Sequence, residues 1–576
     1  MANAGLGAAR HTRKAFCILI VTILGVLPIA AGRGDGDARQ AGAPFDLEEA
    51  TIASLISDQQ SGKRTARAIT EKYLARIDAI DRNGPALRSV IERNPDALTI
   101  ADALDVERKT KGMRGRLHGI PVLIKDNIDT ADRMSTTAGS LALEGSIAAR
   151  DAFVVARLRE AGAIVLGKTN LSEWANFRST HSASGWSGRG GLVLNPYALD
   201  RSACGSSSGT ATAIAANLAA IGVGTETNGS IVCPSAATAL VGVKPTLGLV
   251  SRSGIIPIAH SQDTAGPMTR TVEDAAIVLD ALAGPDTRDS ATTAPRRRQV
   301  PYRAALDRNA LRGARIGVAR AVYFGYNDVT DQIAESAIAD MKAQGAVIVD
   351  PANIPNAGKY DASVMEVLLY EFKADLNRYL GALAPSVRVH SLADLIAFNE
   401  ANRSREMPFF GQELFLSAQK KGPLTEKAYR DALARNHRLS RTEGIDAVMD
   451  KYRLDALIAP TGNPAWTSDL VNGDHFVGSS STPAAVAGYP TVTVPAGSAF
   501  GLPVGISFIG RAWRDDLVLK LAYAYEQATK HRRPPAFPAS APLQGEARSR
   551  NPSGLGIRDS GLGSRVPSPK SRAPTD

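Results

Sequence analysis

The chain has few of the residues on which metal sites and disulfide-rich folds depend. It contains 3 cysteines and 8 histidines in 576 residues. No Cys-x-x-Cys occurs and no histidines pair at metal-ligand spacing, so a zinc site is not expected. Cys204 and Cys233, the two cysteines beyond Cys17, are too few for a disulfide framework. They flank two serine clusters, and the sequence leaves open whether they pair, because it contains no Cα separation.

The body of the chain also lacks the excess of basic residues that nucleic-acid binding requires. The formal net charge is +10, of which residues 1–31 carry +3 and residues 531–576 carry +5, so only +2 remains for the rest. A nucleic-acid site needs Lys and Arg gathered on a folded surface. We therefore expect no nucleic-acid partner.

The apolar run at residues 15–31 is at the short limit for a membrane span. Arg10, Arg13 and Lys14 precede it, and the small residues at 30–32 offer a cleavage site. We predict a signal peptide over residues 1–31 and an exported, periplasmic or secreted protein without stable membrane association after cleavage; an uncleaved anchor is the alternative. Residues 32–44 are typical of a linker, and residues 532–576, rich in Pro, Ser, Gly and Arg, predict a disordered basic tail.

Between these ends, helical and strand patterns alternate. Helical periodicity marks residues 45–110, 151–162, 209–220, 328–344 and most of 360–450. Apolar strand-like runs occur at 119–124, 163–166, 221–224, 315–319, 346–349, 456–459, 491–494 and 504–508. This alternation predicts one large α/β domain over residues 45–531, with a mixed central β-sheet covered by helices on both sides.

Two serine-glycine clusters and one lysine are the candidates for chemistry. The clusters are Gly205-Ser206-Ser207-Ser208-Gly209 and Thr227-Asn228-Gly229-Ser230, and Lys125 ends an apolar strand. A serine needs a base, and a buried lysine can be neutral enough to serve. The first cluster also matches a nucleophile elbow with Ser207 as nucleophile, but a polar, proline-containing segment precedes it where an elbow requires a strand. Residues 224–230 lack the lysine of a phosphate-binding loop.

Taken together, the motifs of the chain resemble those of the amidase signature family over roughly residues 45–531. The matching stretches are Gly119-Ile-Pro-Val-x-x-Lys125-Asp126, Gly167-Lys-Thr-Asn170, Gly205–Gly209, Gly224-Thr-Glu-Thr-Asn-Gly-Ser-Ile231, Gly242-Val-Lys-Pro-Thr-x-Gly248, Ala487-Gly-Tyr-Pro490 and Gly501-Leu-Pro-Val-Gly505.

The resemblance implies a Ser–cis-Ser–Lys triad. It assigns Lys125 as the base, Ser206 as the cis-serine and Ser230 as the nucleophile, and it expects the backbone N–H groups of Thr227, Asn228, Gly229 and Ser230 to hold the oxyanion. No metal and no organic cofactor are implied. The oligomeric state is left open.

Further stretches are similar to bacterial peptide amidases, which remove the C-terminal amide of peptides. These are residues 174–177, 184–191, 225–234, 248–252 and 261–264, and the glycine-serine stretch 184–191 is expected to line the substrate. The resemblance thus implies an amide hydrolase that releases ammonia from peptide amides or related amides. The alternatives are another amidase specificity, a glutaminase-type subunit of a tRNA-dependent amidotransferase, which the export signal disfavours, and a non-catalytic binding protein on an amidase scaffold.

Overall fold

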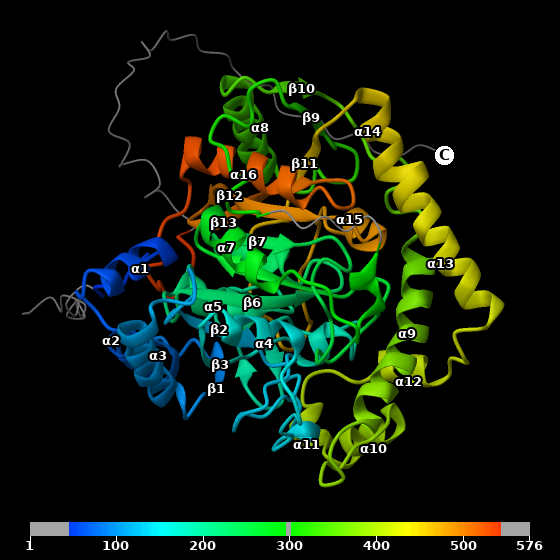
Figure 1. Ribbon diagram of the computed structural model, residues 1–576. Coiled ribbons are helices and arrows are strands. Elements are labelled where there is room, and N and C mark those ends of the chain that lie inside the picture. Colours follow the sequence, from blue (N-terminus) through cyan, green and yellow to red (C-terminus); the bar gives the residue numbers. More distant parts are fainter. Residues whose placement is uncertain (1–44, 295–300, 543–576) are drawn as a thin grey trace, which may run out of the picture. The chain divides into compact units, whose positions relative to one another are not determined.

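The computed structural model describes residues 45–294 and 301–542 (Figure 1). Residues 45–48 form a turn, and the fold described below is that of residues 49–542. The predicted signal peptide, the predicted linker and residues 543–576 of the predicted tail lie outside the described residues. No helix of the described part is both long and apolar enough to cross a membrane.

The described residues form one mixed sheet of eleven strands and a separate two-stranded sheet. The order in the large sheet is β1-β3-β2-β6-β8-β7-β12-β13-β11-β9-β10. Its strands are β1 Val90–Arg93, β2 Pro121–Lys125, β3 Ile164–Thr169, β6 Ile221–Glu226, β7 Val241–Lys244, β8 Thr264–Thr269, β9 Arg315–Val318, β10 Val347–Val349, β11 Ala456–Pro460, β12 Thr491–Ala499 and β13 Leu502–Ile509. The small sheet pairs β4 Trp186–Ser187 with β5 Gly191–Leu192.

The α-helices of the described part alternate with these strands. They are α1 Ile52–Gln60, α2 Ala66–Arg76, α3 Ala97–Lys111, α4 Phe153–Glu160, α5 Ser208–Ala215, α6 Val232–Ala237, α7 Val272–Leu282, α8 Asp328–Ala343, α9 Asp361–Gly381, α10 Leu392–Ala401, α11 Arg403–Glu406, α12 Glu413–Gln419, α13 Lys427–Ser440, α14 Asp446–Tyr452, α15 Thr482–Ala487 and α16 Asp515–Thr529. Short 3₁₀ or π turns are η1 Ile77–Arg82, η2 Leu141–Leu143, η3 Glu173–Asn176, η4 Ser290–Thr293 and η5 Arg441–Ile445.

The predicted fold class is confirmed: the architecture is α/β, with helices packed on a mixed central sheet. The strands expected from apolar runs are present, but three strands of the eleven-stranded sheet and both strands of the small sheet were not expected. β1 lies within the segment 45–110 that was expected to be helical. It was not predicted because a four-residue edge strand is too short to show a period in its sequence. β7 and β8 escaped because they include glycine or proline, residues with low strand propensity.

Two fully buried helices of mostly small residues, α5 and α6, bring the serine clusters to the sheet. Every residue of both helices is buried. The helices approach the strands closely where those strands carry glycine: a Cβ on Gly222 would lie 2.6 Å from Thr210, and one on Gly242 would overlap Ser235. The segments that open these helices, residues 205–208 and 227–231, are therefore held against the middle of the sheet.

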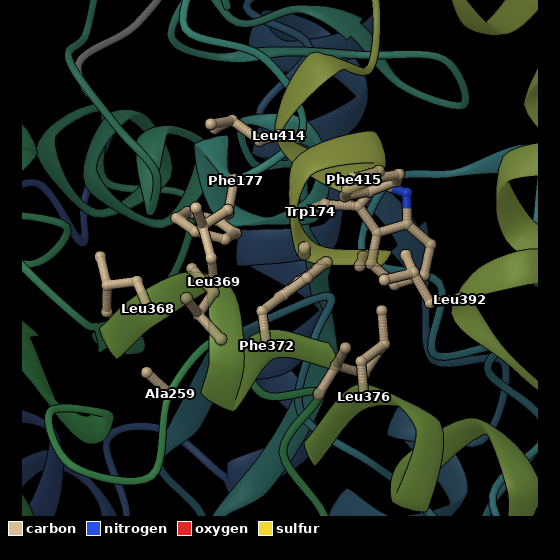
Figure 2. Close-up of a cluster of buried hydrophobic side chains, with 14 of the residues drawn as sticks. Trp174, Phe177, Ala259, Leu368, Leu369, Phe372, Leu376, Leu392, Leu414 and Phe415 are labelled. Atoms are coloured by element: carbon tan, nitrogen blue, oxygen red, sulfur yellow. The ribbon is translucent and has the colours of Figure 1, made fainter. Parts of the chain in front are cut away.

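A helical layer beside the sheet is built from α9, α10, α12 and α13, and Figure 1 shows α9 and α13 running side by side. Its apolar core receives Trp174 and Phe177 from the η3 segment (Figure 2). Phe177 lies 5.0 Å from Phe372, which stacks on Phe415 at 5.3 Å between ring centroids. This packing holds residues 174–176 in left-handed backbone conformations, with φ of 49 to 71°.

The packed structure extends past residue 531, the C-terminal boundary expected for the domain. Arg532 donates to both carboxylate oxygens of Glu49 at 2.7 Å and to the carbonyl oxygens of Ala215 and Ala239. Residues 537 and 538 also bond to the backbone of residues 196 and 199. The described chain therefore stays in contact with the body of the domain well into the segment expected to form the tail.

Candidate active site

Lys125 ends strand β2, whose five residues are all buried, so its ammonium group is delivered into the protein rather than to solvent. The Nζ atom lies 2.7 Å from the Ser206 Oγ, 3.0 Å from the Thr225 Oγ1 and 3.3 Å from the Thr225 carbonyl oxygen. Burial lowers the pKa of Lys125 to about 7. The nearby carboxylates of Glu226 and Asp263 favour the charged amine and only partly oppose this effect. Lys125 is thus poised to exchange a proton near neutral pH.

Ser206 follows a cis peptide bond from Gly205 and is fully buried. A Cβ on Gly205 would collide with the Ser172 Oγ, so only glycine fits before this serine. The next serine, Ser207, donates from Oγ to the Thr225 carbonyl oxygen at 3.0 Å and from its N–H to the Ser230 carbonyl oxygen at 3.2 Å. The first serine cluster is therefore bonded both to strand β6 and to the second cluster.

Ser230 lies between β6 and α6, is 8% exposed and lines a cavity of about 510 Å³. The turn before it is shaped by Glu226, whose carboxylate accepts from the N–H groups of Gly229 at 2.8 Å, Ile231 at 2.7 Å and Val232 at 3.0 Å. Gly229 takes φ of +81°, which favours glycine. Of the four N–H groups predicted for the oxyanion, that of Gly229 is thus already used by Glu226.

The cavity beside Ser230, here called the reaction cavity, is lined by the four residues predicted for the oxyanion, whereas Lys125 and Ser206 are fully buried and are not among its lining residues. Gly205, Thr227, Asn228, Gly229 and Ser230 all line it. Its other walls are residues 175–184, Leu368 on α9, and Trp466, Phe476 and their neighbours in the loop before α15. Of the stretch 184–191 expected to line the substrate, Ser184 lines the reaction cavity, whereas much of the remainder forms the β4–β5 hairpin.

Cys204 and Cys233 form a disulfide, with Cα atoms 6.0 Å apart, which resolves the question that the sequence left open. Cys204 stands two residues before Ser206 and Cys233 three residues after Ser230. Both also line the reaction cavity, where Trp466 packs against them. The disulfide therefore ties the two serine segments together covalently.

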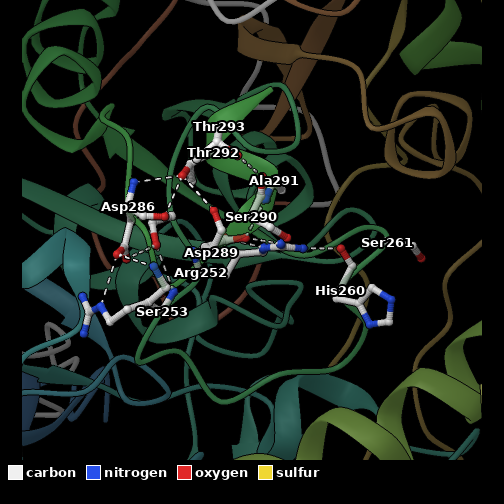
Figure 3. Close-up of polar contacts among 12 residues, drawn as sticks. Arg252, Ser253, His260, Ser261, Asp286, Asp289, Ser290, Ala291, Thr292 and Thr293 are labelled. Atoms are coloured by element: carbon white, nitrogen blue, oxygen red, sulfur yellow. Dashed lines mark hydrogen bonds and ion pairs between the residues drawn. The ribbon is translucent and has the colours of Figure 1, made fainter. Parts of the chain in front are cut away.

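A second cavity of about 260 Å³ shares Ala175, Thr227 and Ile258 with the reaction cavity. Its wall at residues 252–263 is fixed by polar contacts: Figure 3 shows Arg252 bonded to Asp289 and to the His260 carbonyl oxygen. Half-buried Asp263 accepts from the Thr227 hydroxyl at 2.6 Å and from two backbone N–H groups, while desolvation raises its pKa to about 6. This wall therefore supports the turn that carries Ser230.

His260, Glu371 and Asp375 bring three metal-ligand types within 4.8 Å of one another. Their carboxylates are already acceptors: Asp375 accepts from the His260 Nδ1 at 2.7 Å, and Glu371 accepts from the Tyr429 hydroxyl at 2.7 Å and the Ser261 N–H at 2.9 Å. The carboxylates also raise the pKa of His260 against the effect of its burial. The cluster is thus satisfied as a hydrogen-bonded histidine, and we assign it no metal.

Sequence reasoning missed the supporting roles of Thr225, Glu226 and Asp263. In the sequence, Glu226 and Asp263 are only members of the matching stretches 224–231 and 261–264. Their roles depend on contacts with Lys125 and with the turn of residues 227–230, which no local pattern reveals.

Comparisons with known proteins identify the family of the chain. The amidase family model matches residues 68–519. The chain is 41% identical over 504 residues to a probable amidase of Arabidopsis thaliana, covering 86% of this chain and 92% of the relative. It is 34% identical over 483 residues to one of the subunits of glutamyl-tRNA(Gln) amidotransferase from Symbiobacterium thermophilum, covering 82% of this chain and 95% of the relative. The crystal structure of native peptide amidase from Stenotrophomonas maltophilia shares 51% identity and a TM-score of 0.82, covering 86% of this chain and 100% of that chain.

The chain belongs to the amidase signature family, as its motifs predicted, and it is an amide hydrolase.

Proposed function

We propose that the protein hydrolyses amides through Lys125, Ser206 and Ser230, with a covalent acyl-enzyme. The observation that carries this proposal is the 2.7 Å contact between the Lys125 Nζ and the Ser206 Oγ, together with a lysine pKa of about 7. Neutral Lys125 accepts the Ser206 proton while Ser206 accepts the Ser230 proton, and the Ser230 Oγ attacks the amide carbonyl carbon.

The negative charge that develops on the carbonyl oxygen needs nearby N–H donors. We expect the backbone of residues 227–230 to supply them, with the N–H of Gly229 shared with Glu226. Ser206 then gives its proton to the departing nitrogen while protonated Lys125 returns a proton to Ser206, so that the C–N bond breaks, the amine leaves and Lys125 is neutral again. A water molecule, activated by the same pair of groups, cleaves the ester to release the acid and restore Ser230.

We infer that the substrates are peptides with a C-terminal amide, so that the leaving amine is ammonia. The 51% identity to a peptide amidase over that entire chain supports this substrate class more strongly than the 34% identity to the amidotransferase relative supports glutamine. A reaction cavity of about 510 Å³ lies within the range of small-molecule sites, about 300–1,000 Å³, and suits a short peptide end.

We also propose export to the periplasm or the medium, on the basis of the basic and apolar pattern of residues 1–31. Cell fractionation with N-terminal sequencing of the mature protein tests this. A cytosolic protein with an intact N-terminus would refute it and would favour the amidotransferase alternative.

Ammonia release from a library of peptide amides, compared with glutamine and simple acyl amides, tests the substrate class. Labelling by a fluorophosphonate probe tests the nucleophile: Ser230→Ala is expected to abolish labelling, while Ser207→Ala keeps a reactive serine and serves as the matched variant for the elbow alternative. Labelling that survives Ser230→Ala and disappears in Ser207→Ala would overturn the assignment.

A further inference from the structure

The loop between β11 and α15 separates the reaction cavity from a third cavity that the reaction does not use. Asn463 and Gly478 pair at the ends of the loop, so residues 463–478 form a closed surface loop. The third cavity, about 590 Å³, is lined by residues 463–467, 469, 472–475 and 477 of this loop, by Arg201, Tyr326 and Asn327, and by Ala499, Phe500 and Leu502 of the β12–β13 hairpin.

The reaction cavity and the third cavity meet along one set of residues. Trp466, Asn472, Gly473 and Asp474 line both. The two spaces are therefore neighbours on either side of these residues.

The shared wall is held in place by hydrogen bonds. Asp474 accepts from the Trp466 Nε1 at 3.1 Å and from the Ser184 N–H at 3.0 Å, and the Trp466 carbonyl oxygen accepts from the Ser202 N–H at 2.7 Å. Such a wall needs no ordering when a ligand binds, which lowers the entropic cost of binding.

The rim of the third cavity exposes apolar side chains that a folded protein normally buries. Phe500 is 52% exposed and Val477 is 47% exposed. Exposed large apolar groups around a hollow are typical of binding surfaces. The lining also includes the charged Arg201 and Asp469, so the cavity suits a chain with both apolar and polar groups, as a peptide has.

A peptide with a reacting C-terminal amide extends from the reaction centre in one direction only, toward its N-terminus. Each extended residue adds about 3.3–3.6 Å, so a few residues carry the chain out of the reaction cavity. The second cavity also borders the reaction cavity, but it is smaller, about 260 Å³, and its charged groups are largely paired with one another.

On these grounds we propose that the third cavity binds the N-terminal part of the substrate, so that the enzyme favours amides of longer peptides over those of single amino acids. This inference rests on the proposed function, since it names the substrates of the same site more closely. Because binding far from the reacting bond stabilises ground state and transition state alike, its effect appears in KM rather than in kcat.

The test measures ammonia release from a ladder of amides with one to five residues of alanine and phenylalanine. We expect KM to fall about tenfold between the one-residue and the four-residue amide, with kcat changing little. In the double variant Val477→Ser with Phe500→Ser, we expect the KM for the four-residue amide to rise about three- to tenfold relative to that for the one-residue amide. Both side chains are exposed, so the variant is expected to fold.

Two control variants test whether a change in KM is specific to the third cavity. Val471→Ser removes an apolar side chain that is 86% exposed and lines none of the three cavities, and it is expected to leave the ratio of KM values unchanged. Arg378→Ala alters the rim of the second cavity instead. If the ratio of KM values for the four-residue and one-residue amides changes in Arg378→Ala and not in the double variant, the substrate peptide extends through the second cavity and the inference is overturned.

A KM independent of peptide length would also overturn the inference while leaving the proposed function intact. Hydrolysis of simple amides without any release of ammonia from peptide amides would instead refute the proposed substrate class.

Discussion

The ionisation of Lys125 allows the sharpest test of the proposed mechanism. An ordinary lysine has a pKa of 10.5, whereas burial lowers that of Lys125 to about 7. At pH 7 about half of the enzyme then holds the neutral amine, against roughly 1 in 3,000 at the ordinary pKa. We therefore expect kcat/KM to rise with pH through a midpoint near 7, because only the neutral amine can accept a proton.

Removal of the base should slow the reaction strongly. We expect Lys125→Met to lower kcat/KM about 10²–10⁴-fold, the usual contribution of a general base. The same change should stabilise the fold. Between pH 7 and pH 10.5 the unfolded chain holds a proton on this lysine that the folded protein lacks, so the wild-type stability rises with pH across this window. Removal of the buried amine should therefore stabilise the protein by up to about 4 kcal/mol at pH 7.

The assays are ammonia release from pH 5 to 9 and thermal unfolding over the same range. Lys244→Met is the matched control, since Lys244 is also fully buried with a pKa lowered to about 8, but its Nζ donates to the Pro245 carbonyl oxygen. Asp263→Asn should move the rising limb to lower pH, because it removes a carboxylate that favours charged Lys125. A pH profile that is flat from 5 to 8, or wild-type kcat/KM in Lys125→Met, would refute the reasoning.

Three further predictions concern the support of the site. The Cys204–Cys233 disulfide ties the two serine segments together, so its reduction by dithiothreitol should lower kcat severalfold and reversibly. If mass spectrometry confirms that the disulfide is reduced and kcat is unchanged, this prediction is contradicted. Gly205→Ala should abolish activity or soluble expression, because its Cβ overlaps Ser172; an active variant would show that this segment can move. Truncation after residue 542 should leave Tm unchanged, whereas truncation after residue 531 should lower Tm by several degrees because Arg532 is lost. Equal Tm values for the two truncated proteins would show that the contacts of Arg532 contribute nothing to stability.

Much of the fold could be predicted from the sequence because its signals are local. Strand β2 is a continuous apolar run, and the helix Asp328–Ala343 shows a regular period between two strands. Strand β8 could not be predicted this way, since its Gly and Pro residues disfavour a strand and only pairing with β6 and β7 makes it one.

The same distinction between local signals and tertiary contacts applies to the candidate site. Motif resemblance was sufficient to select Lys125, Ser206 and Ser230, because the glycines and serines that shape each turn are neighbours in the chain. The sequence could not decide the fate of Cys204 and Cys233, since a disulfide depends on a Cα separation that the fold creates across 29 residues.

By itself, the sequence determined the fold class and the family and selected the three residues proposed as the triad, since each follows from local patterns and motifs. Only the tertiary structure decided the protonation of Lys125, because burial and the carboxylates of distant residues set its pKa. It alone also decided that Glu226 holds the turn before Ser230, and that the loop 463–478 places a further cavity beside the reaction centre. Electrostatics and cavity shape arise from groups far apart in the chain, so they exist only once the chain has folded.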